Sequence, residues 1–372
     1  MTALPEFADD ITAQLNSCGA PATDVAILQP ADPFLDMAGE DLRRRIFLTE
    51  SETGAALCLR PEFTIPVCLD HIARRAATPR RYGYLGEVFR QRREGGAEFF
   101  QAGIEDLGEA DIATADARSV ADAHALLARL LPGKALAVTI GDQSVFEAVL
   151  AALGLPRGWQ KRLARAFGSP GALEAALSDL ANPTRAAALD EPAASLLLAG
   201  EPEPLAAHIA ERMEDAGHSL GAGRSPLEIA KRLIEKSELR SVRLSDEALN
   251  ALKAFLDIRV PLGDAHAALE AFAGEAKLSL GGALARFGAR AEAIAAHGLS
   301  GEFEYDAAFG RPLDYYTGLV FEIGLPGDTP PLAGGGRYDR LLTLLGAKTP
   351  IPGVGFSAWI DRISDIRERE RP

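Results

Sequence analysis

Apolar and polar positions alternate along the first part of the chain in a way that favours a sheet flanked by helices. Apolar residues between positions 4 and 18 recur at helical spacing and stop before Pro21, which predicts an amphipathic helix at the start. The same spacing predicts helices over residues 63–76 and 113–131. The predicted strands cover residues 25–28, 46–49, 56–59, 82–90, 99–106 and 135–140.

The pattern changes after Asp142. Residues 144–279 are rich in alanine, leucine and glutamate, give almost no strand signal, and are interrupted by Gly/Pro turns, which is typical of a helical segment. A helix over residues 283–297 and strands over 303–308 and 319–324 then restore the earlier pattern. The expected parts are residues 1–143 (first part of a core), 144–280 (helical insertion) and 281–372 (second part of the core).

Composition excludes several classes of protein. With 372 residues, 47% of them hydrophobic, the chain can bury a sizeable core. No apolar run is long enough to span a bilayer and the start lacks the layout of a signal peptide, so we expect a cytoplasmic protein with no membrane partner. The net charge of −14 disfavours a nucleic acid such as tRNA as the main partner, although arginines cluster between residues 74 and 93.

The cysteines and histidines give no metal-binding signal. Cys18, Cys58 and Cys68 are scattered, and none of the six histidines has a second ligand at metal spacing. We interpret the cysteines as small buried side chains. The sequence therefore predicts no metal, no cofactor and no catalytic histidine.

Residues 309–318, FGRPLDYYTG, are the most informative segment, because they set a cation, a carboxylate and two phenols in one turn. Alone, the segment fits an ordinary strand edge equally well. Residues 59–64 (LRPEFT), 86–90 (GEVFR) and 101–105 (QAGIE) add carboxylates, an amide and another cation upstream. A free amino acid needs an anion for its ammonium, a cation for its carboxylate and groups shaped to its side chain, so these segments together predict a pocket for one.

In this order, the segments resemble the histidine-binding core of the histidyl-tRNA synthetases. The resemblance continues at residues 334–339 (GGGRYD), similar to the family's second histidine signature, and at residues 353–356 with Asp361 and Arg362, similar to class II motif 3. It covers nearly the whole chain. It implies an α+β fold, with the antiparallel sheet of class II aminoacyl-tRNA synthetases, flanking helices and the helical insertion.

The resemblance also implies roles for individual residues. Each has a simpler alternative: a helix cap for the glutamates, a structural ion pair for the arginine at 311, and core packing for the tyrosines. We assign Tyr315 to the core. By resemblance, Glu62, Thr64 and Gln101 would hold the α-amino group, Arg90 and Arg311 would face the carboxylate, Glu105 and Tyr316 would hydrogen-bond the imidazole, and Tyr338 would line the ring pocket.

Departures from the synthetase pattern bear on activity. Arg92 stands where those enzymes have a motif 2 glutamate, the loop after it is short, and Asp361 replaces the motif 3 glutamate. Because acidic groups hold Mg²⁺ on ATP, the arginine argues against adenylate formation, whereas Arg90 and Arg362 leave nucleotide binding open. We interpret the glycines at 334–336 as a tight turn, since no P-loop is present.

After Arg362 only residues 363–372 remain, whereas a histidyl-tRNA synthetase continues into an anticodon-binding domain. The chain therefore resembles the non-catalytic paralogues that serve as regulatory subunits of short-form ATP phosphoribosyltransferase in the first step of histidine biosynthesis. The resemblance implies three partners: the catalytic subunit of that transferase, L-histidine, and a second copy of the chain bound through the strand at 25–30. A histidyl-tRNA synthetase core and a histidine-dependent signalling module stay open as alternatives.

Overall fold

The computed structural model describes residues 4–37, 39–92, 96–181, 191–216, 225–241, 244–313, 315–327 and 330–369. Within these ranges no helix is both long and apolar enough to cross a membrane.

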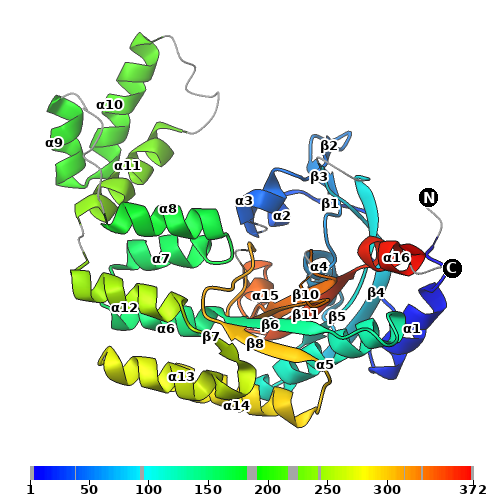
Figure 1. Cartoon of the computed structure of the whole chain (residues 1–372). Helices are drawn as coiled ribbons and strands as arrows, with labels where there is room; N and C mark the ends of the chain where they lie inside the picture. Colours follow the sequence, from blue (N-terminus) through cyan, green and yellow to red (C-terminus); the bar gives the residue numbers. More distant parts are fainter. Residues whose placement is uncertain are drawn as a thin grey trace.

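An eight-stranded sheet organises the molecule, in the order β4-β5-β11-β10-β9-β6-β8-β7 (Figure 1). Neighbouring strands in this sheet are antiparallel, except for β6 and β8, which are parallel. A separate three-stranded sheet has the order β1-β3-β2. The strands are β1 (Leu28–Pro30), β2 (Leu48–Glu50), β3 (Ala56–Leu59), β4 (Arg80–Phe89), β5 (Glu98–Leu107), β6 (Ala137–Asp142), β7 (Arg259–Pro261), β8 (Glu302–Asp306), β9 (Leu319–Gly324), β10 (Ala333–Arg337) and β11 (Gly353–Trp359).

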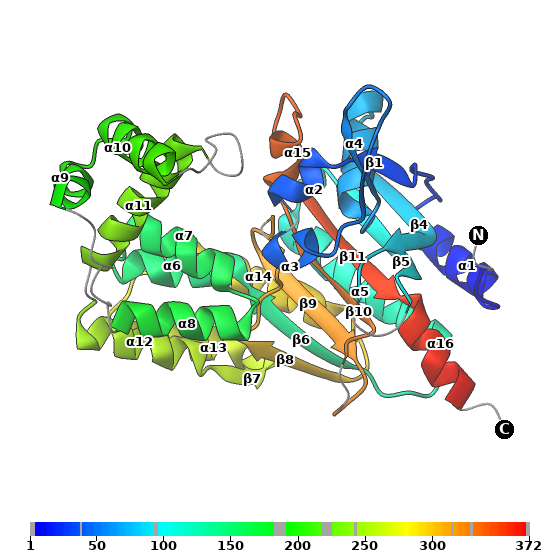
Figure 2. The same ribbon diagram turned by 90° about the horizontal axis from the view of Figure 1, so that it is seen from above.

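Helices cover both faces of the large sheet. Helix α5 lies against β10 and β11 with α14 and α1 beside it, whereas α4 and α15 pack on the opposite face. Helices α9 to α11 extend away from the end that carries both termini (Figure 2). The helices are α1 (Ala8–Ser17), α2 (Asp32–Met37), α3 (Gly39–Arg43), α4 (Thr64–Arg74), α5 (Ile112–Leu130), α6 (Gln143–Ala152), α7 (Arg157–Ala166), α8 (Pro170–Ala181), α9 (Glu191–Ala199), α10 (Pro202–Asp215), α11 (Pro226–Ser241), α12 (Asp246–Leu256), α13 (Leu262–Glu275), α14 (Gly282–Ala296), α15 (Leu341–Leu344) and α16 (Ile360–Arg369).

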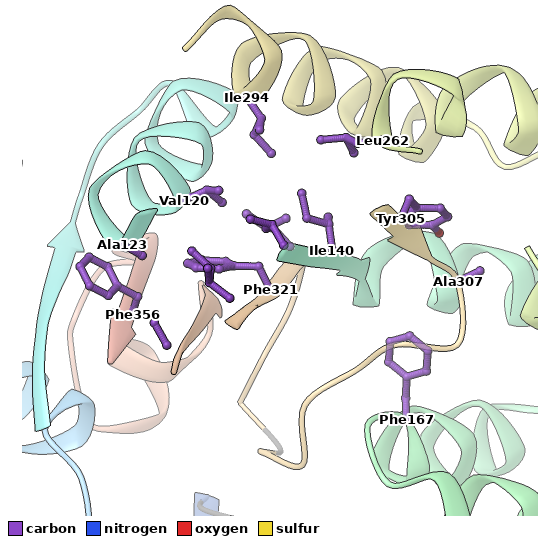
Figure 3. Packing of buried hydrophobic residues seen from close by; sticks show 14 of the residues in the cluster. Val120, Ala123, Ile140, Phe167, Leu262, Ile294, Tyr305, Ala307, Phe321 and Phe356 are labelled. Atoms are coloured by element: carbon purple, nitrogen blue, oxygen red, sulfur yellow. The ribbon is translucent and has the colours of Figure 1, made fainter. Parts of the chain in front are cut away.

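The main hydrophobic core fills the space between the sheet and helices α5 and α14. Val120 and Ile294 reach from the helices toward Ile140 and Phe321 on the strands (Figure 3). The same cluster includes buried residues of α6, α7, α12 and α13. A small separate cluster ties α9, α10 and α11 together. Much of the predicted insertion therefore shares the core of the sheet, and β7 extends the sheet itself, while the boundaries at 144 and 280 stay a prediction.

Strand periodicity gives the sheet two chemically different faces. Ala102 and Ile104 of β5 point into the core under α5, and the residues that alternate with them, such as Gln101 and Glu105, face the α4 side. The same alternation on β11 sends Phe356 to the core and its two neighbours to the α4 side. A site on the α4 side can therefore be polar without disturbing the main core.

Two predictions about local structure are wrong. The glycines at 334–336 do not form a tight turn, because they are the middle of β10, a buried strand between β9 and β11. The first strand begins at Leu28 and not at Val25, because Arg60 takes the carbonyls of Val25 and Ile27 through its side chain and its backbone N–H. The other predicted strands and helices outside the insertion are present, with ends displaced by a few residues.

A buried network of charges joins α5, α14 and β10. The Asp116 carboxylate, which is fully buried, accepts a hydrogen bond from Arg290 Nε at 2.5 Å and another from Arg337 Nε at 2.7 Å. Arg290 also pairs with Asp142, which caps α6, and Arg337 pairs with Asp339 at 2.6 Å. Removing one member of such a network would leave an uncompensated buried charge, so the network fixes the position of β10 and the residues after it.

Candidate functional site

A cavity of about 310 Å³ opens on the α4 face of the sheet, over β5, β10 and β11. It brings together side chains from the start of α4, the end of β4, the middle of β5 and the loop between β8 and β9. Seven of the eight residues predicted to bind histidine line it: Glu62, Thr64, Arg90, Gln101, Arg311, Tyr316 and Tyr338. The eighth, Glu105, does not line the cavity but hydrogen-bonds Thr64 and Tyr338, which do.

The floor of the cavity is made of glycines, which leave room for side chains to lie flat on the sheet. A methyl group added at Gly334 would coincide with a guanidinium, and one added at Gly336 would come within 2.8 Å of a phenol ring. One added at Gly355 would coincide with a carboxylate. The three pairs are Arg311 over Gly334, Tyr316 over Gly336, and Glu105 over Gly355.

Glu62 caps the N-terminal end of α4 and also faces the cavity. Its carboxylate accepts hydrogen bonds from the backbone N–H groups of Thr64 at 2.6 Å and Ile65 at 2.9 Å. Burial raises its pKa, while these hydrogen bonds and the nearby Arg90 act in the opposite direction. Glu62 therefore does cap the helix, as the simpler alternative predicts, and its side chain is also part of the cavity wall.

Glu105 is fully enclosed and reaches the cavity through other side chains. Its carboxyl oxygens accept hydrogen bonds from Thr64 Oγ1 at 2.7 Å and from the Tyr338 hydroxyl. Burial raises its pKa to about 8 in spite of these hydrogen bonds, so the carboxyl is mostly protonated at neutral pH. Any effect of Glu105 on a ligand passes through the Thr64 and Tyr338 hydroxyls or requires them to move.

The two predicted cations are held in place differently. Arg90 Nε donates to the Pro61 carbonyl at 2.6 Å, and burial lowers the pKa of Arg90 to about 10, so it stays charged at neutral pH. Arg311 Nη1 donates to Glu322 Oε1 at 2.8 Å, and its guanidinium carbon lies 5.6 Å from the centre of the Trp359 ring. Both guanidinium groups are therefore oriented before any ligand arrives.

Two polar atoms in the residues of the cavity wall have no hydrogen-bond partner in the described part of the chain. They are Gln101 Oε1, an acceptor, and Arg311 Nε, a donor, and both are buried. Leaving a buried polar group unpaired costs roughly 1–3 kcal/mol. A ligand that offers both a donor and an acceptor, as the ammonium and carboxylate of an amino acid do, would remove this cost at both positions.

Sequence reasoning missed part of the wall. Glu322 interrupts the otherwise apolar strand β9, and this lone carboxylate was the available signal. Arg45 and Trp359 also line the cavity but only the fold brings them there. Tyr315 is buried in the hydrophobic cluster that joins α4 and α15 to the sheet, in agreement with its assignment to the core, and it contributes to the cavity wall as well. Asp314 lies outside the described residues.

Two of the three departures from the synthetase pattern, Arg92 and Asp361, pair with each other. Arg92 Nη1 lies 3.0 Å from Asp361 Oδ2, and the Arg92 guanidinium carbon lies 3.4 Å from the centre of the Phe99 ring. Arg362, a candidate for nucleotide binding, lies over the Trp359 ring at 4.5 Å and lines the same cavity. An acidic group that could hold Mg²⁺ is thus neutralised by an arginine from the same chain, and residues 93–95 of the short loop lie outside the described residues.

Comparisons of the sequence show which known proteins the chain is similar to. The chain matches the family model described as "Histidyl-tRNA synthetase" over residues 10–240 and 230–363. A protein of Mesorhizobium japonicum named "ATP phosphoribosyltransferase regulatory subunit" is 71% identical over 365 residues, which cover 98% of each chain. One of Chelativorans sp. with the same name is 66% identical over 364 residues, again covering 98% of each.

Two solved structures share the fold. A structure described as an ATP phosphoribosyltransferase regulatory subunit/histidyl-tRNA synthetase of Bacillus halodurans has a TM-score of 0.66 at 23% identity, covering 98% of this chain and 81% of its own. Histidyl-tRNA synthetase of Nostoc sp. has a TM-score of 0.63 at 17% identity, covering 97% of this chain and 70% of its own. The predicted class II synthetase-like α+β fold is confirmed.

The glycine floor makes a prediction about stability. Gly355→Ala should lower the free energy of unfolding by about 1–3 kcal/mol, because the added methyl group meets the Glu105 carboxylate and the Ile104 carbonyl. Gly274→Ala is the matched control, since this helical glycine has open space around it and alanine should be neutral or stabilising by about 0.5–1 kcal/mol. Urea denaturation measures both, and equal stabilities of the two variants would contradict the close packing.

The raised pKa of Glu105 predicts a dependence of stability on pH. The folded chain keeps a proton up to about pH 8 that the unfolded chain releases near the ordinary pKa of 4.5. This carboxyl therefore contributes stability that is complete below pH 4.5 and is lost as the pH rises toward 8, by up to about 1 kcal/mol per pH unit. Urea denaturation of Glu105→Gln from pH 5 to 9 should show a shallower decline than the unsubstituted chain. Parallel declines would contradict the burial of a neutral carboxyl.

Proposed function

Because the chain belongs to the ATP phosphoribosyltransferase regulatory subunits, within the histidyl-tRNA synthetase family, we propose that it joins a short-form catalytic subunit of that transferase, supports its activity and makes it sensitive to histidine. In this proposal the chain works in the cytoplasm, in the first step of histidine biosynthesis. The observation that carries the histidine part is one unpaired acceptor, Gln101 Oε1, and one unpaired donor, Arg311 Nε, on residues that line a cavity of amino-acid size.

We propose that free L-histidine binds with its backbone groups at these two atoms. Gln101 Oε1, with Glu62 and Thr64 beside it, accepts the ammonium group. Arg311 Nε and the Arg90 guanidinium take the carboxylate, and a charge-assisted hydrogen bond is about twice as strong as a neutral one. Burial of these groups supports the arrangement, because a hydrogen bond is electrostatically stronger where water is excluded.

The imidazole would lie toward the tyrosines. The Tyr338 hydroxyl donates its proton to Glu105 and can therefore accept a hydrogen bond from the ring, whereas the Tyr316 hydroxyl can donate one. A ring with a donor nitrogen and an acceptor nitrogen matches two hydroxyls of this kind, whereas an apolar side chain of the same size would leave them unpaired. This is the proposed basis of selectivity for histidine.

The ion pair of Arg92 with Asp361 favours a regulatory subunit over a synthetase core. Adenylate formation needs metal-bound ATP, and the pair places a cation where a carboxylate would hold the metal. Histidine binding without adenylation leaves the ligand intact as a signal. Feedback by histidine then requires only that the ligand favours one state of the complex with the transferase.

We also propose that the chain forms a dimer through the small sheet β1-β3-β2. Leu28 and Leu48 on its outer strands are 49% and 59% exposed, and neighbouring Ile27 is also exposed. Leu28 lies opposite Leu59 on one face of the sheet, and Leu48 lies opposite Cys58 on the other, so each outer strand carries an exposed leucine. Edge strands such as β1 and β2 offer unpaired backbone groups and apolar side chains to a second chain, and a two-fold dimer is the commonest arrangement of like chains.

Histidine binding should depend on the unpaired acceptor, Gln101 Oε1. Gln101→Leu should weaken L-histidine binding by about tenfold or more, since a hydrogen bond to a charged group contributes about 1.5–3 kcal/mol. Glu105→Gln should weaken it less, because this carboxyl is mostly neutral and acts only through the Thr64 and Tyr338 hydroxyls, and histamine, which lacks the carboxylate, should bind less tightly than histidine. Isothermal titration calorimetry measures all three, with Gln14→Leu on α1 as the matched control. Absence of both heat and thermal stabilisation at millimolar histidine would contradict the proposal.

The regulatory role predicts two results with the purified chain. Alone, it should show no histidine-dependent exchange of pyrophosphate into ATP, because Arg92 occupies the acidic position. Mixed with a short-form transferase, it should raise turnover and confer inhibition by histidine. Arg311→Ala should weaken the inhibition and leave the raised turnover, because the arginine lies in the cavity and not on an outer surface. Strong exchange by the chain alone would favour the synthetase alternative.

Self-association should depend on the small sheet. Light scattering of the purified chain should give about twice the mass of the 39.4 kDa monomer, and Leu48→Glu should shift the mass toward the monomer by placing a charge in the interface. Leu4→Glu is the control, since Leu4 is as exposed but lies outside the sheet. A monomer at micromolar concentration, without a partner protein, would overturn the proposed dimer.

A further inference from the structure

A second cavity, of about 580 Å³, lies between α7, the start of α6 and the residue before α15. It shares four lining residues with the proposed histidine pocket, on the loop between β8 and β9, so this loop separates the two. The shared residues are Arg311, Leu313, Tyr315 and Tyr316. The remaining wall comes from elements that do not touch the first cavity.

One side of α7 is basic and faces this cavity. Arg157, Lys161 and Arg165 are spaced four residues apart, so they form a single stripe along the helix, and all three line the cavity. The other side of the helix carries Trp159 and Leu163, which are buried in the main core. Because the apolar side of α7 is packed into the core, the three basic side chains on its other side point into the cavity.

The cavity has a large excess of positive charge. Five cations line it, and Glu147 is the one carboxylate among the described lining residues. Arg340 lies 3.9 Å from Glu147, and Arg311 pairs with Glu322. The three cations of α7 have no ion-pair partner among the described residues. Like charges four residues apart destabilise a helix, and here they occur in a chain whose net charge is −14.

We propose that this basic cavity, formed by the α7 stripe with Arg311 and Arg340, binds a small molecule that carries phosphate groups. Several cations converging on one concave space fit the closely spaced charges of a phosphate ester or pyrophosphate. Phe167, Leu313 and Leu344 give an apolar wall on which the organic part of such a molecule can rest. The volume lies in the range of small-molecule sites.

A long polyanion fits the same cavity less well. RNA or an acidic peptide would continue past the cavity over the surface of an acidic chain, where its charges are repelled. A compact anion fits within the cavity and therefore meets only the local excess of positive charge. The basic cavity is also distinct from the proposed histidine pocket, because the cations of α7 belong to it and not to that pocket.

Calorimetric titration of the full chain with pyrophosphate at fixed ionic strength tests the proposal. We expect one pyrophosphate bound per chain, more tightly than inorganic phosphate. Lys161→Gln and Arg165→Gln should each weaken binding by about three- to tenfold, because each removes one charge contact. Both side chains are exposed, so the fold should persist, which thermal unfolding checks. Lys253→Gln on α12, an exposed lysine outside the cavity, should leave binding unchanged.

Three results would overturn the proposal. The first is no binding at millimolar pyrophosphate, and the second is equal weakening by Lys253→Gln, which would mean that the anion meets only the general field of the protein. The third is tight binding of an RNA oligonucleotide or an acidic peptide, lost in Lys161→Gln, that pyrophosphate does not displace. That result would assign the α7 stripe to a macromolecule.

Discussion

The proposed histidine pocket depends on the absence of side chains from two adjacent strands. Gly334 and Gly336 of β10 and Gly355 of β11 lie in one region of the α4 face, and a functional group rests on each of them. Without this floor, Arg311 could not lie against the sheet beside Glu322, and Glu105 could not be covered by Thr64 and a tyrosine. Glycine in a strand usually weakens it, and close approach of another group is the reason such a strand is kept.

Strand β10 is held in place from its opposite face, which compensates for the flexibility of its glycines. Arg337 alternates with the floor residues and therefore points under the sheet, where it meets Asp116 between α5 and α14. Since Asp142 joins this network and also caps α6, the position of β10 is linked to the start of the helical segment that carries the basic cavity. The two cavities are thus built on one connected framework, and Arg311 belongs to both.

The sequence predicted the residues of the pocket better than their arrangement. Glu62, Gln101 and Arg311 could be found because their motifs occur in family order, and the structure brings them to one cavity. The glycines at 334–336 could not be placed correctly, because a run of glycine gives the same local signal in a turn and in a strand that another side chain must cross. The pair of Arg92 with Asp361 was equally hidden, since the two residues are distant in the sequence, and Arg92 alone indicated a lost acidic group while Asp361 alone indicated only a shorter one.

A crystal structure of the chain with L-histidine would show whether this cavity binds the amino acid. We expect histidine in the cavity of Glu62 and Gln101, with its ammonium nitrogen within hydrogen-bond distance of Gln101 Oε1 and its carboxylate at Arg311 Nε. The ring should lie against Tyr316 and Tyr338, and the pair of Arg92 with Asp361 should remain closed. Histidine bound in the basic cavity of α7 instead, or in the reverse orientation with its carboxylate at Gln101, would contradict the account.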